Sequence, residues 1–199
     1  MVDKTNYQKM ISGELYNSVD PELFALAAAT GQRRAEFSAI PPDDMVARVG
    51  ALKNLLGAVG DFALILEPFH MDYGKHIKLG DQCFINSGAT FLDSNYITIG
   101  DRVSVGPNVQ FITATHPILP EERIVQAPGD PILPFRPMTI AKPITIDEDC
   151  WIGAGAIIMP GVSIGMATIV GAGAIVTKSL PERVIAVGNP ARVIRSIDD

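Results

Sequence analysis

The chain has 199 residues, of which 47% are hydrophobic and 19% charged, and its formal net charge is −6. This length suits one domain, or one domain with a short appendage, and the low charge content indicates much surface buried in a repetitive core or an oligomer interface. The acidic balance argues against a nucleic-acid-binding surface, which needs a basic face, but allows a small anionic ligand held by a local basic cluster.

The sequence carries neither a membrane span nor a secretory signal. Its apolar runs fall well short of the roughly 18 to 20 residues of a spanning helix, and the N-terminal stretch MVDKTNYQKMISGEL lacks the apolar core of a signal peptide. Cys83 and Cys150 stand among apolar neighbours without metal-binding or CxxC spacing, and we expect both to be buried. These features predict a cytoplasmic protein with no membrane partner.

Residues 1–60 predict a small helical segment. Asp20-Pro21-Glu22 is typical of a helix start, with Asp20 as the N-cap and Pro21 at the first helical position. A second start lies at Pro42-Asp43-Asp44, and it precedes apolar residues at helical spacing, namely Met45, Val49, Leu52 and Leu56. We expect two helices here, ahead of a different architecture.

From Leu79 onward an apolar residue recurs at every sixth position. The first series is Leu79, Ile85, Phe91, Ile97, Val103 and Val109, and the second is Ile146, Ile152, Ile158, Ile164, Val170 and Val176. Period six fits neither a helix nor a lone half-buried strand. It is typical of a triangular coil in which three short strands each place one aliphatic residue in a central stack, with about 18 residues per coil. We therefore predict a mainly β parallel β-helix over residues 61–180.

The two series do not share a phase, so the pattern must break between them. The break lies in residues 112–139, a stretch with six prolines that loses the repeat. Long excursions of this kind inside compact domains are usually functional or disordered, and we predict a loop extruded from the coil. Residues 181–199 also leave the pattern, and we expect them to cap the apolar end of the last coil.

Several segments resemble the maltose/galactoside O-acetyltransferase family of hexapeptide-repeat acyltransferases. KMISGELYNSVDPEL is similar to the family's N-terminal segment, and its body is matched by DYGKHIKLGD, ATHPI, PITIDEDCWIGAGAIIMPGVSIG and GAGAIVTKSLPERVIAVGNPARVI. Only residues 119–138 depart, being longer than in the bacterial members and richer in proline. The resemblance implies a left-handed parallel β-helix, assembled as a homotrimer with active sites between subunits. It also implies transfer of an acetyl group from acetyl-CoA to a hydroxyl of a sugar or related acceptor.

His116 is the candidate general base. It stands in FITATHPILP, where the six-residue repeat stops and the chain leaves the stack. Histidine has an unperturbed pKa of roughly 6.5, so its neutral form can take a proton from an alcohol near pH 7. His116 also matches the family's catalytic histidine.

The resemblance implies further residues around the acetyl carbonyl and the acceptor. Asn86 matches an asparagine near the acetyl carbonyl, with a plain corner residue of the coil as the alternative. Asp72 matches an acceptor-side position, where a carboxylate would accept hydrogen bonds from sugar hydroxyls. Asp93 falls in the next corner region. The acceptor-contacting acid of the galactoside enzymes stands one place later, where this chain has Ser94, so galactoside specificity is in doubt.

Two N-terminal residues are also candidates for acceptor contact. Asp20 is a substrate-binding candidate, although its N-cap role is the favoured interpretation, and Tyr16 is a similar candidate. In the extruded loop, Phe135, Arg136 and Met138 are candidates to line an acceptor pocket that differs from that of the sugar enzymes. We expect the loop to influence acceptor preference more than acetyl-CoA binding.

For coenzyme A, the family match points to Ala154, Ala172, Thr177, Lys178, Arg192 and Arg195. Small residues at 154 and 172 would let backbone groups approach the pantetheine arm and stabilise an oxyanion. The basic residues would neutralise the phosphates, and arginine can bind two oxygens at once. Trp151 is expected to pack at a coil corner instead of contacting ligand.

Other functions are compatible with parts of this pattern. A zinc enzyme resembling the γ-type carbonic anhydrases has three histidines available, His70, His76 and His116, but their spacing does not match that family, and we expect no metal site. An acetyltransferase for a non-sugar alcohol or an amine keeps the same donor site, and a catalytically inactive scaffold is weakened by His116. Gly161-Val162-Ser163-Ile164-Gly165 satisfies the G-x-S-x-G pattern but lies inside the repeat, where a nucleophile elbow does not form.

Overall fold

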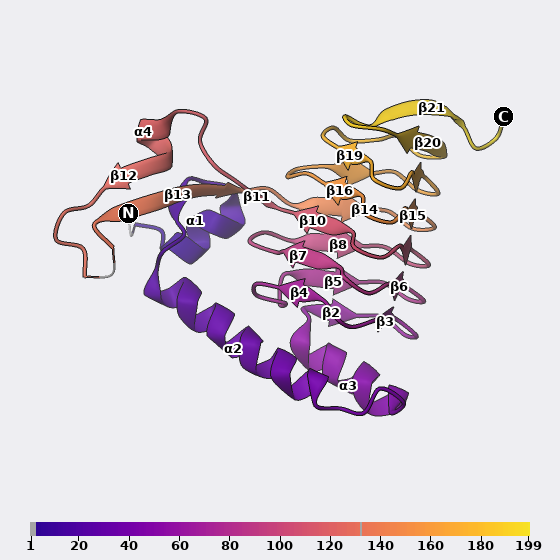
Figure 1. Ribbon diagram of the computed structural model, residues 1–199, viewed down its shortest axis with the longest axis horizontal. Helices are drawn as coiled ribbons and strands as arrows, with labels where there is room; N and C mark the ends of the chain where they lie inside the picture. Colours follow the sequence, from indigo (N-terminus) through magenta and orange to yellow (C-terminus); the bar gives the residue numbers. More distant parts are fainter. Residues whose placement is uncertain (1–2, 132) are drawn as a thin grey trace.

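A parallel β-solenoid with three faces forms the body of the molecule (Figure 1). The first N-terminal helix and a long loop lie on one side of it, and the third helix lies under its first coil. The computed structural model describes residues 3–131 and 133–199. Within those ranges, no helix is both long and apolar enough to cross a bilayer. The three-faced solenoid confirms the mainly β hexapeptide-repeat fold predicted from the sequence.

Three helices and one short strand precede the solenoid: α1 (Asn6–Ser12), β1 (Tyr16–Asn17), α2 (Pro21–Ser38) and α3 (Met45–Leu55). Asp20 caps α2 by accepting the Glu22 N–H, and Asp44 caps α3 by accepting the Ala47 N–H, so both predicted helix starts are confirmed. Helix α1 was not predicted. Its signal is a capping box, in which the Thr5 and Gln8 side chains accept each other's backbone N–H.

The chain visits the three faces of the solenoid in a fixed order, coil after coil. The first face holds β2 (Ala58–Val59), β5 (Ile77–Leu79), β8 (Ile97–Ile99), β14 (Ile144–Ile146) and β17 (Ser163–Ile164). The second holds β3 (Leu64–Ile65), β6 (Phe84–Ile85), β9 (Ser104–Val105), β15 (Trp151–Ile152), β18 (Ile169–Val170) and β20 (Val184–Val187). The third holds β4 (His70–Met71), β7 (Thr90–Leu92), β10 (Gln110–Ile112), β16 (Ile157–Ile158) and β19 (Ile175–Val176).

The predicted repeat residues form the core. Every member of the two six-residue series is at most 3% exposed, and so are Cys83 and Cys150. Stacked aromatic rings of Phe91 and Phe111, 5.2 Å apart, continue the column on the third face. Trp151 differs from its prediction, because it lies on the outer side of β15 and is 56% exposed.

The coils have two lengths, which the sequence did not reveal. On the second face Phe84 pairs with Ser104, twenty residues further on, whereas Trp151 pairs with Ile169, eighteen residues further on. The two extra residues of the early coils lie between the third and first faces, around residues 72–76 and 93–96. We call this edge of the solenoid the loop corner, because the extruded loop also leaves from it after β10.

The ends of the solenoid are closed differently. The first strand, β2, begins at Ala58, slightly before the predicted boundary at residue 61. Near the C-terminus β20 still pairs in parallel with β18, and β21 (Arg192–Ser196) folds back antiparallel on β20. The cap predicted for residues 181–199 therefore contains one more solenoid strand as well as the returning strand.

The extruded loop is ordered as a β-ribbon with one helical turn: β11 (Ala114–Thr115), α4 (Pro120–Arg123), β12 (Ile124–Gln126) and β13 (Phe135–Ala141). Strand β13 pairs antiparallel with β11, β12 and the N-terminal β1. The ribbon, β1 and α1 thus form one body beside the loop corner, to the left of the solenoid in Figure 1, whereas α3 lies under the first coil.

Asn95 joins this body to the solenoid. The residue is 2% exposed, and its side-chain amide donates to the carbonyls of Met10 and Ala141, at 3.1 Å each. Its carbonyl oxygen accepts the Tyr96 N–H at 2.7 Å. One side chain at the loop corner therefore connects α1, the ribbon and the coil.

We predict that Asn95→Ala lowers the free energy of unfolding by about 2–4 kcal/mol, because it leaves several buried backbone groups without a partner. Urea denaturation at pH 7 measures this. Thr98→Ala, on the exposed outer side of β8, is the control and should change stability by less than about 0.5 kcal/mol. Equal effects of the two substitutions would show that the Asn95 bonds do not hold the N-terminal body in place.

Candidate functional site

His116 is held in the tautomer that a general base needs. It is exposed at the start of the ribbon, and its Nδ1 lies 2.8 Å from the carbonyl oxygen of Met138. A carbonyl only accepts hydrogen bonds, so Nδ1 must carry the proton. In the neutral ring Nε2 then has a free lone pair, which can accept a proton from an alcohol.

The Met138 carbonyl is available because the ladder on that edge of β13 is interrupted. Strand β11 pairs with Ile140 and Ala141, and β12 pairs with residues 135–137, so the register steps over Met138. The chain between these two strands holds His116 and the helical turn α4. The His116 ring thus takes the place of a backbone partner, since strand carbonyls need one.

The two faces of the ribbon are chemically different. Side chains directly opposite each other in an antiparallel pair share a face, and so do residues two apart. Tyr16 opposes Thr139, Ile124 opposes Pro137 and Gln126 opposes Phe135. One face therefore carries all six of these side chains. If the Ala114–Ala141 and Thr115–Ile140 register is extended by one residue, His116 falls opposite Thr139 and so on this face. We call it the His116 face.

The opposite face of the ribbon lines a cavity of about 450 Å³. Asn17, Val125, Arg136 and Met138 lie on this face by register, and all four line the cavity. Arg136 and Met138, predicted to line an acceptor pocket, thus line this cavity, whereas Phe135 points to the other side. Asp20 also lines the cavity, while its carboxylate caps α2 and accepts the Asn6 amide at 2.7 Å.

Asp72 and Asp93, the two predicted acceptor-binding acids, lie in unlike surroundings at the loop corner. The Asp72 side chain is 33% exposed, and burial raises the pKa of its carboxyl above the usual value. The Tyr16 hydroxyl is close enough to both Ser94 and Asp72 to interact with them. Asp72 is therefore a partly open carboxylate next to the His116 face, where an acceptor hydroxyl can reach it.

Asp93 does not take the predicted acceptor position. It is 0% exposed, and its Oδ1 accepts the backbone N–H groups of Asp72 and Tyr73 at 2.8 and 3.0 Å. Burial raises the pKa of this carboxyl too. Its position makes it a support for the backbone that presents Asp72, and not a contact for ligand.

The three histidines make separate contacts. His76 is 3% exposed and its Nδ1 lies 2.5 Å from the Asp93 carbonyl oxygen, among the rings of Tyr7, Tyr73 and Tyr96. His70 lies 3.4 Å from Asp72 and 3.1 Å from Arg34. Across residues 3–131 and 133–199, no cluster of three or more His, Cys, Asp or Glu side chains has the geometry of a metal site.

Asn86 lies at a different corner from His116. It follows β6, where the chain turns from the second face to the third, and is half-buried. Its side-chain oxygen accepts the Ser87 N–H at 2.8 Å, which leaves the NH₂ group as the free end of the amide. Within one chain, the third face separates Asn86 from the loop corner, so the structure does not bring these two predicted catalytic residues together.

Ala154 and Ala172 stack above Asn86 on the same corner. The Gly173 N–H donates to the Ala154 carbonyl at 2.8 Å, which places the two alanines on consecutive coils. Both are exposed. Adjacent Gly153 is packed so tightly that an added Cβ would lie 2.5 Å from the Ala172 nitrogen. The result is a flat corner of accessible backbone, as the coenzyme prediction requires.

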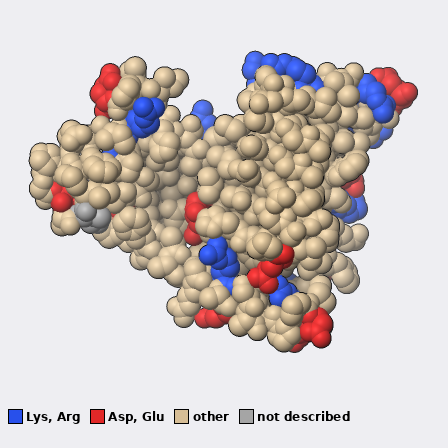
Figure 2. Space-filling model, in the orientation of Figure 1, with Lys and Arg blue, Asp and Glu red and all other residues tan. Residues whose placement is uncertain are grey.

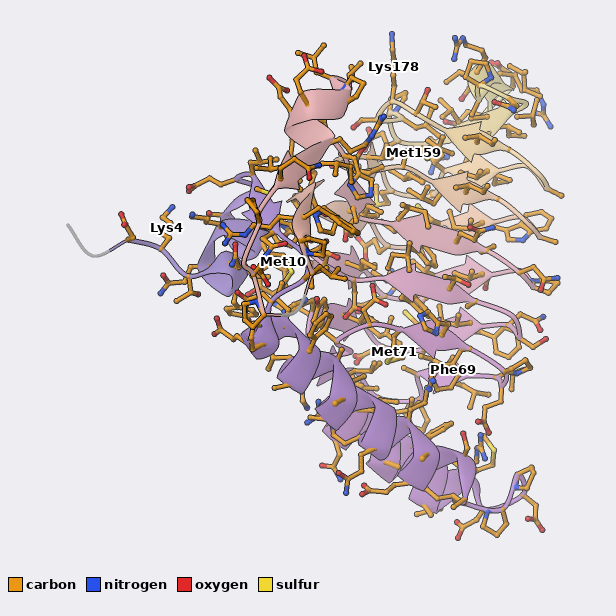
Figure 3. The ribbon with its side chains drawn as sticks, turned by 60° about the vertical axis from the view of Figure 1, so that its left-hand side comes forward. Lys4, Met10, Phe69, Met71, Met159 and Lys178 are labelled. Carbon is orange, nitrogen blue, oxygen red and sulfur yellow. The ribbon has the colours of Figure 1, made fainter. Side chains whose placement is uncertain are left out.

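The predicted basic residues lie at the C-terminal end of the solenoid, where Figure 2 shows Lys and Arg side chains gathered. Thr177 and Lys178 follow β19 at the loop corner, and Figure 3 shows Lys178 extending from that end. Arg192 pairs with Val187 across β20 and β21, beside the Ala172 corner. The predicted cofactor residues are therefore split between two corners of one chain.

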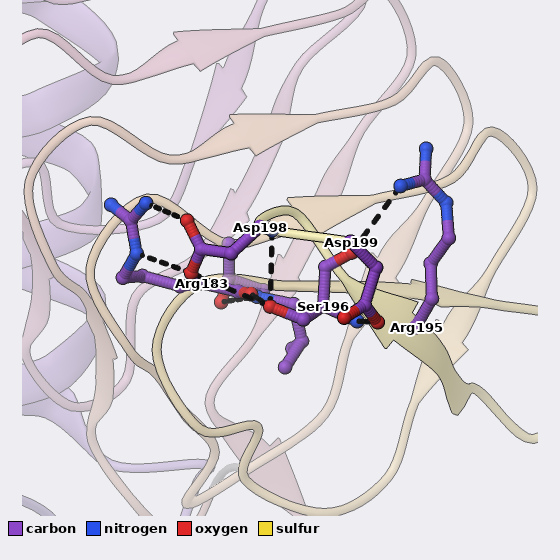
Figure 4. A network of polar contacts seen from close by, with 7 residues as sticks. Arg183, Arg195, Ser196, Asp198 and Asp199 are labelled. Carbon is purple, nitrogen blue, oxygen red and sulfur yellow. Dashed lines mark hydrogen bonds and ion pairs between the residues drawn. The ribbon is translucent and has the colours of Figure 1, made fainter.

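Arg195 belongs to a small polar network at the chain end (Figure 4). Its guanidinium donates to the Ser196 carbonyl at 3.3 Å, while Arg183 binds the Asp198 carboxylate at 2.9 Å through Nε. Arg183 thus fixes the acidic tail, and the exposed Arg195 keeps most of its donors open to solvent.

Sequence reasoning missed the Met138 carbonyl and the supporting role of Asn95. The first is a backbone group and has no residue-type signal. The second stands in the DSNY stretch, where an asparagine two residues after an acid looks like an ordinary turn residue.

Two family models match the chain. The maltose acetyltransferase hexapeptide capping motif matches residues 9–60, and the bacterial transferase hexapeptide model, of six repeats, matches residues 143–178. The first covers the N-terminal helices and the second covers the coils that carry Ala154 and Ala172.

Known proteins resemble the chain over nearly its full length. A galactoside O-acetyltransferase of Lactococcus lactis is 32% identical over 98% of this chain and 89% of its own. The crystal structure of a maltose O-acetyltransferase from Clostridium difficile 630 is 36% identical, with a TM-score of 0.88 over 98% and 99% of the two chains. A hexapeptide-repeat acetyltransferase from Vibrio cholerae, complexed with acetyl coenzyme A, is 34% identical, with a TM-score of 0.83 over 98% and 100%.

We predict that Asp72→Asn raises the stability of the protein at pH 8, because burial disfavours the charged carboxylate, as its raised pKa shows. As the pH falls, the Asp72 carboxyl is protonated in the folded protein before it is protonated in the unfolded chain. The stability advantage of Asp72→Asn should therefore shrink as the pH falls through the raised folded-state pKa. It should vanish below the pKa of Asp72 in the unfolded chain. Urea denaturation at pH 8, 6 and 4 measures the trend, with the exposed Asp43→Asn for comparison. An advantage of Asp72→Asn that grows toward acid would contradict the assignment.

Proposed function

The chain belongs to the maltose/galactoside O-acetyltransferase family of hexapeptide-repeat acyltransferases, and we propose that it moves an acetyl group from acetyl-CoA directly to a hydroxyl of a sugar or sugar-like small molecule. His116 is the general base of this reaction. The observation that carries the proposal is the hydrogen bond from His116 Nδ1 to the Met138 carbonyl, which leaves Nε2 as the basic nitrogen.

The reaction balances with this one base. Nε2 of His116 removes the proton of the acceptor hydroxyl as the oxygen attacks the thioester carbonyl carbon. The carbon–sulfur bond then breaks, an acetate ester forms, and the coenzyme A sulfur takes up the proton from the imidazolium. Asp72, partly open beside the same face, accepts a hydrogen bond from a second hydroxyl and orients the acceptor.

The corner of Ala154 and Ala172 supports the donor side of the proposal. Two consecutive coils expose backbone there, so the pantetheine arm can lie along them without meeting a side chain larger than a methyl group. Exposed Lys178, Arg192 and Arg195 give the end of an acidic protein a local positive charge. Coenzyme A phosphates would bind there, since guanidinium groups match phosphate oxygens in geometry and charge.

We also propose that the active protein is a homotrimer in which each site lies between two copies. Asn86 and His116 occupy different corners of one chain, so an adjacent copy is needed to place an Asn86 amide near a His116 ring. The outer side of the second face carries Phe84 and Trp151, which are 38% and 56% exposed. Large apolar side chains in such positions favour burial against another copy. Lys178 and Arg192, also on different corners, would then meet around one coenzyme.

We predict that His116→Ala lowers the rate of acetyl transfer about 10²- to 10⁴-fold while acetyl-CoA still binds, because only the base is lost. Free thiol release measures turnover on maltose, glucose, galactosides, amino alcohols and aromatic alcohols, and calorimetry measures acetyl-CoA binding. Glu121→Ala, exposed on α4 in the same loop, is the control. Wild-type turnover in His116→Ala would contradict the general-base proposal. Thiol release with the amino alcohols alone would contradict a sugar acceptor.

The shared site predicts complementation between two inactive variants. Co-expressed His116→Ala and Asn86→Ala chains should regain about a quarter of wild-type activity, because random mixing in a closed ring restores one interface in four. A mixture of His116→Ala with Asp72→Ala should stay inactive, since both residues serve the same loop corner. Light scattering on the purified mixtures checks that they are trimers. Absence of activity in the first mixture would contradict a site built from two copies.

A further inference from the structure

Beyond Thr139, the His116 face of the ribbon carries three apolar residues in a row, with Gln126 opposite Phe135 at the far end. Strand register places Pro137, Ile124 and Phe135 on this face in succession, leading away from His116. Ile124 is 40% exposed and Phe135 is 36% exposed. We call these three residues the apolar strip.

The strip has a polar counterpart on the other side of the same two strands. Val125 opposes Arg136 on the opposite face, and the cavity there is also lined by Asn17, Asp20 and Asp130. The cavity side of these two strands carries the charged Arg136, whereas the other side carries the apolar strip and the uncharged Gln126, since adjacent strand residues alternate in direction. Only the side with the apolar strip is continuous with the side that carries His116.

The chain just after His116 exposes two more large apolar side chains. Ile118 is 91% exposed and Leu119 is 49% exposed, and both precede α4. The ribbon with α4, β12 and β13 projects from the solenoid in Figure 1. The reacting hydroxyl must come to His116, so whatever is attached to that hydroxyl on this side lies over the strip.

We propose that the apolar strip binds an aliphatic or aromatic group of the acceptor, which makes the preferred acceptor an amphiphile: a polar, hydroxyl-bearing head joined to an apolar chain or ring. This inference rests on the proposed function and specifies its substrate class. The head lies between His116 and Asp72, and the apolar group leaves along Pro137, Ile124 and Phe135. Burial of the apolar group against the strip would add about fourfold in affinity for each methylene removed from water.

The ribbon offers a matched pair of variants for the test. Ile124 and Val125 are neighbours on β12 with exposed fractions of 40% and 39%, but they face opposite sides. Thiol release with methyl, butyl and hexyl glucosides gives kcat/KM for wild type, Ile124→Ser and Val125→Ser. We expect the wild type to prefer the hexyl over the methyl glucoside by tenfold or more, as about two buried methylenes would give. Ile124→Ser should cut that ratio about fivefold, whereas Val125→Ser should leave it unchanged.

The outcomes separate this inference from the function on which it rests. Equal rates on all three glucosides, or equal effects of the two substitutions, would contradict the proposed binding role of the strip. Neither outcome would contradict acetyl transfer itself. A lower oligomer mass for Ile124→Ser by light scattering would assign the strip to contact between copies, and would also overturn it. If no glucoside releases thiol, the proposed function falls. Calorimetry of hexyl glucoside binding to the same three proteins then tests the apolar strip. The strip proposal requires that only Ile124→Ser binds hexyl glucoside more weakly than the wild type.

Discussion

The loop corner depends on side chains that replace the backbone ladder. A β-solenoid satisfies its N–H and C=O groups by stacking one coil on the next, and this fails wherever a coil is longer than its neighbour. Two residues are added to the early coils at this corner, and buried side chains complete their hydrogen bonding. Asp93 accepts two backbone N–H groups, and Asn95 bridges the coil to α1 and the ribbon. The Thr30 hydroxyl of α2 adds a further bond, donating to the Tyr73 carbonyl at 2.7 Å. Buried side chains thus link the N-terminal segment to this corner.

The same kind of replacement sets the chemistry of His116. The ladder along β13 steps over Met138, and the imidazole takes the carbonyl that remains. An exposed histidine on a flexible loop would sample both tautomers and many orientations. Here a backbone acceptor selects one nitrogen for the proton and aims the other outward. The interruption in the ribbon is therefore part of the proposed active site, and the extra chain that causes it also carries the apolar strip.

The sequence was informative where a residue type has one structural use. Aliphatic residues at period six fixed the stack, the break in that period located the loop, and Asp20 and Asp44 marked two helices. It was less informative where a residue type has several uses. Ile97 and Ile99 both fit an inward position, which concealed the longer coils. Asp93 and Asp72 look alike in a motif, although one holds backbone and the other is partly open. The Met138 carbonyl, being backbone, could not be found from residue identity.

The two coil lengths divide the molecule along its axis. The longer coils, with the N-terminal helices and the ribbon, carry the residues proposed to meet the acceptor, and the shorter coils carry those proposed to meet the coenzyme. Because the extra residues lie outside the aliphatic stack, evolution can lengthen or trim that corner without shifting the register of any other strand. Acceptor recognition can therefore diverge by insertion and deletion at one edge while the donor half stays constant. Recombination between relatives near β14 would exchange one half as a module.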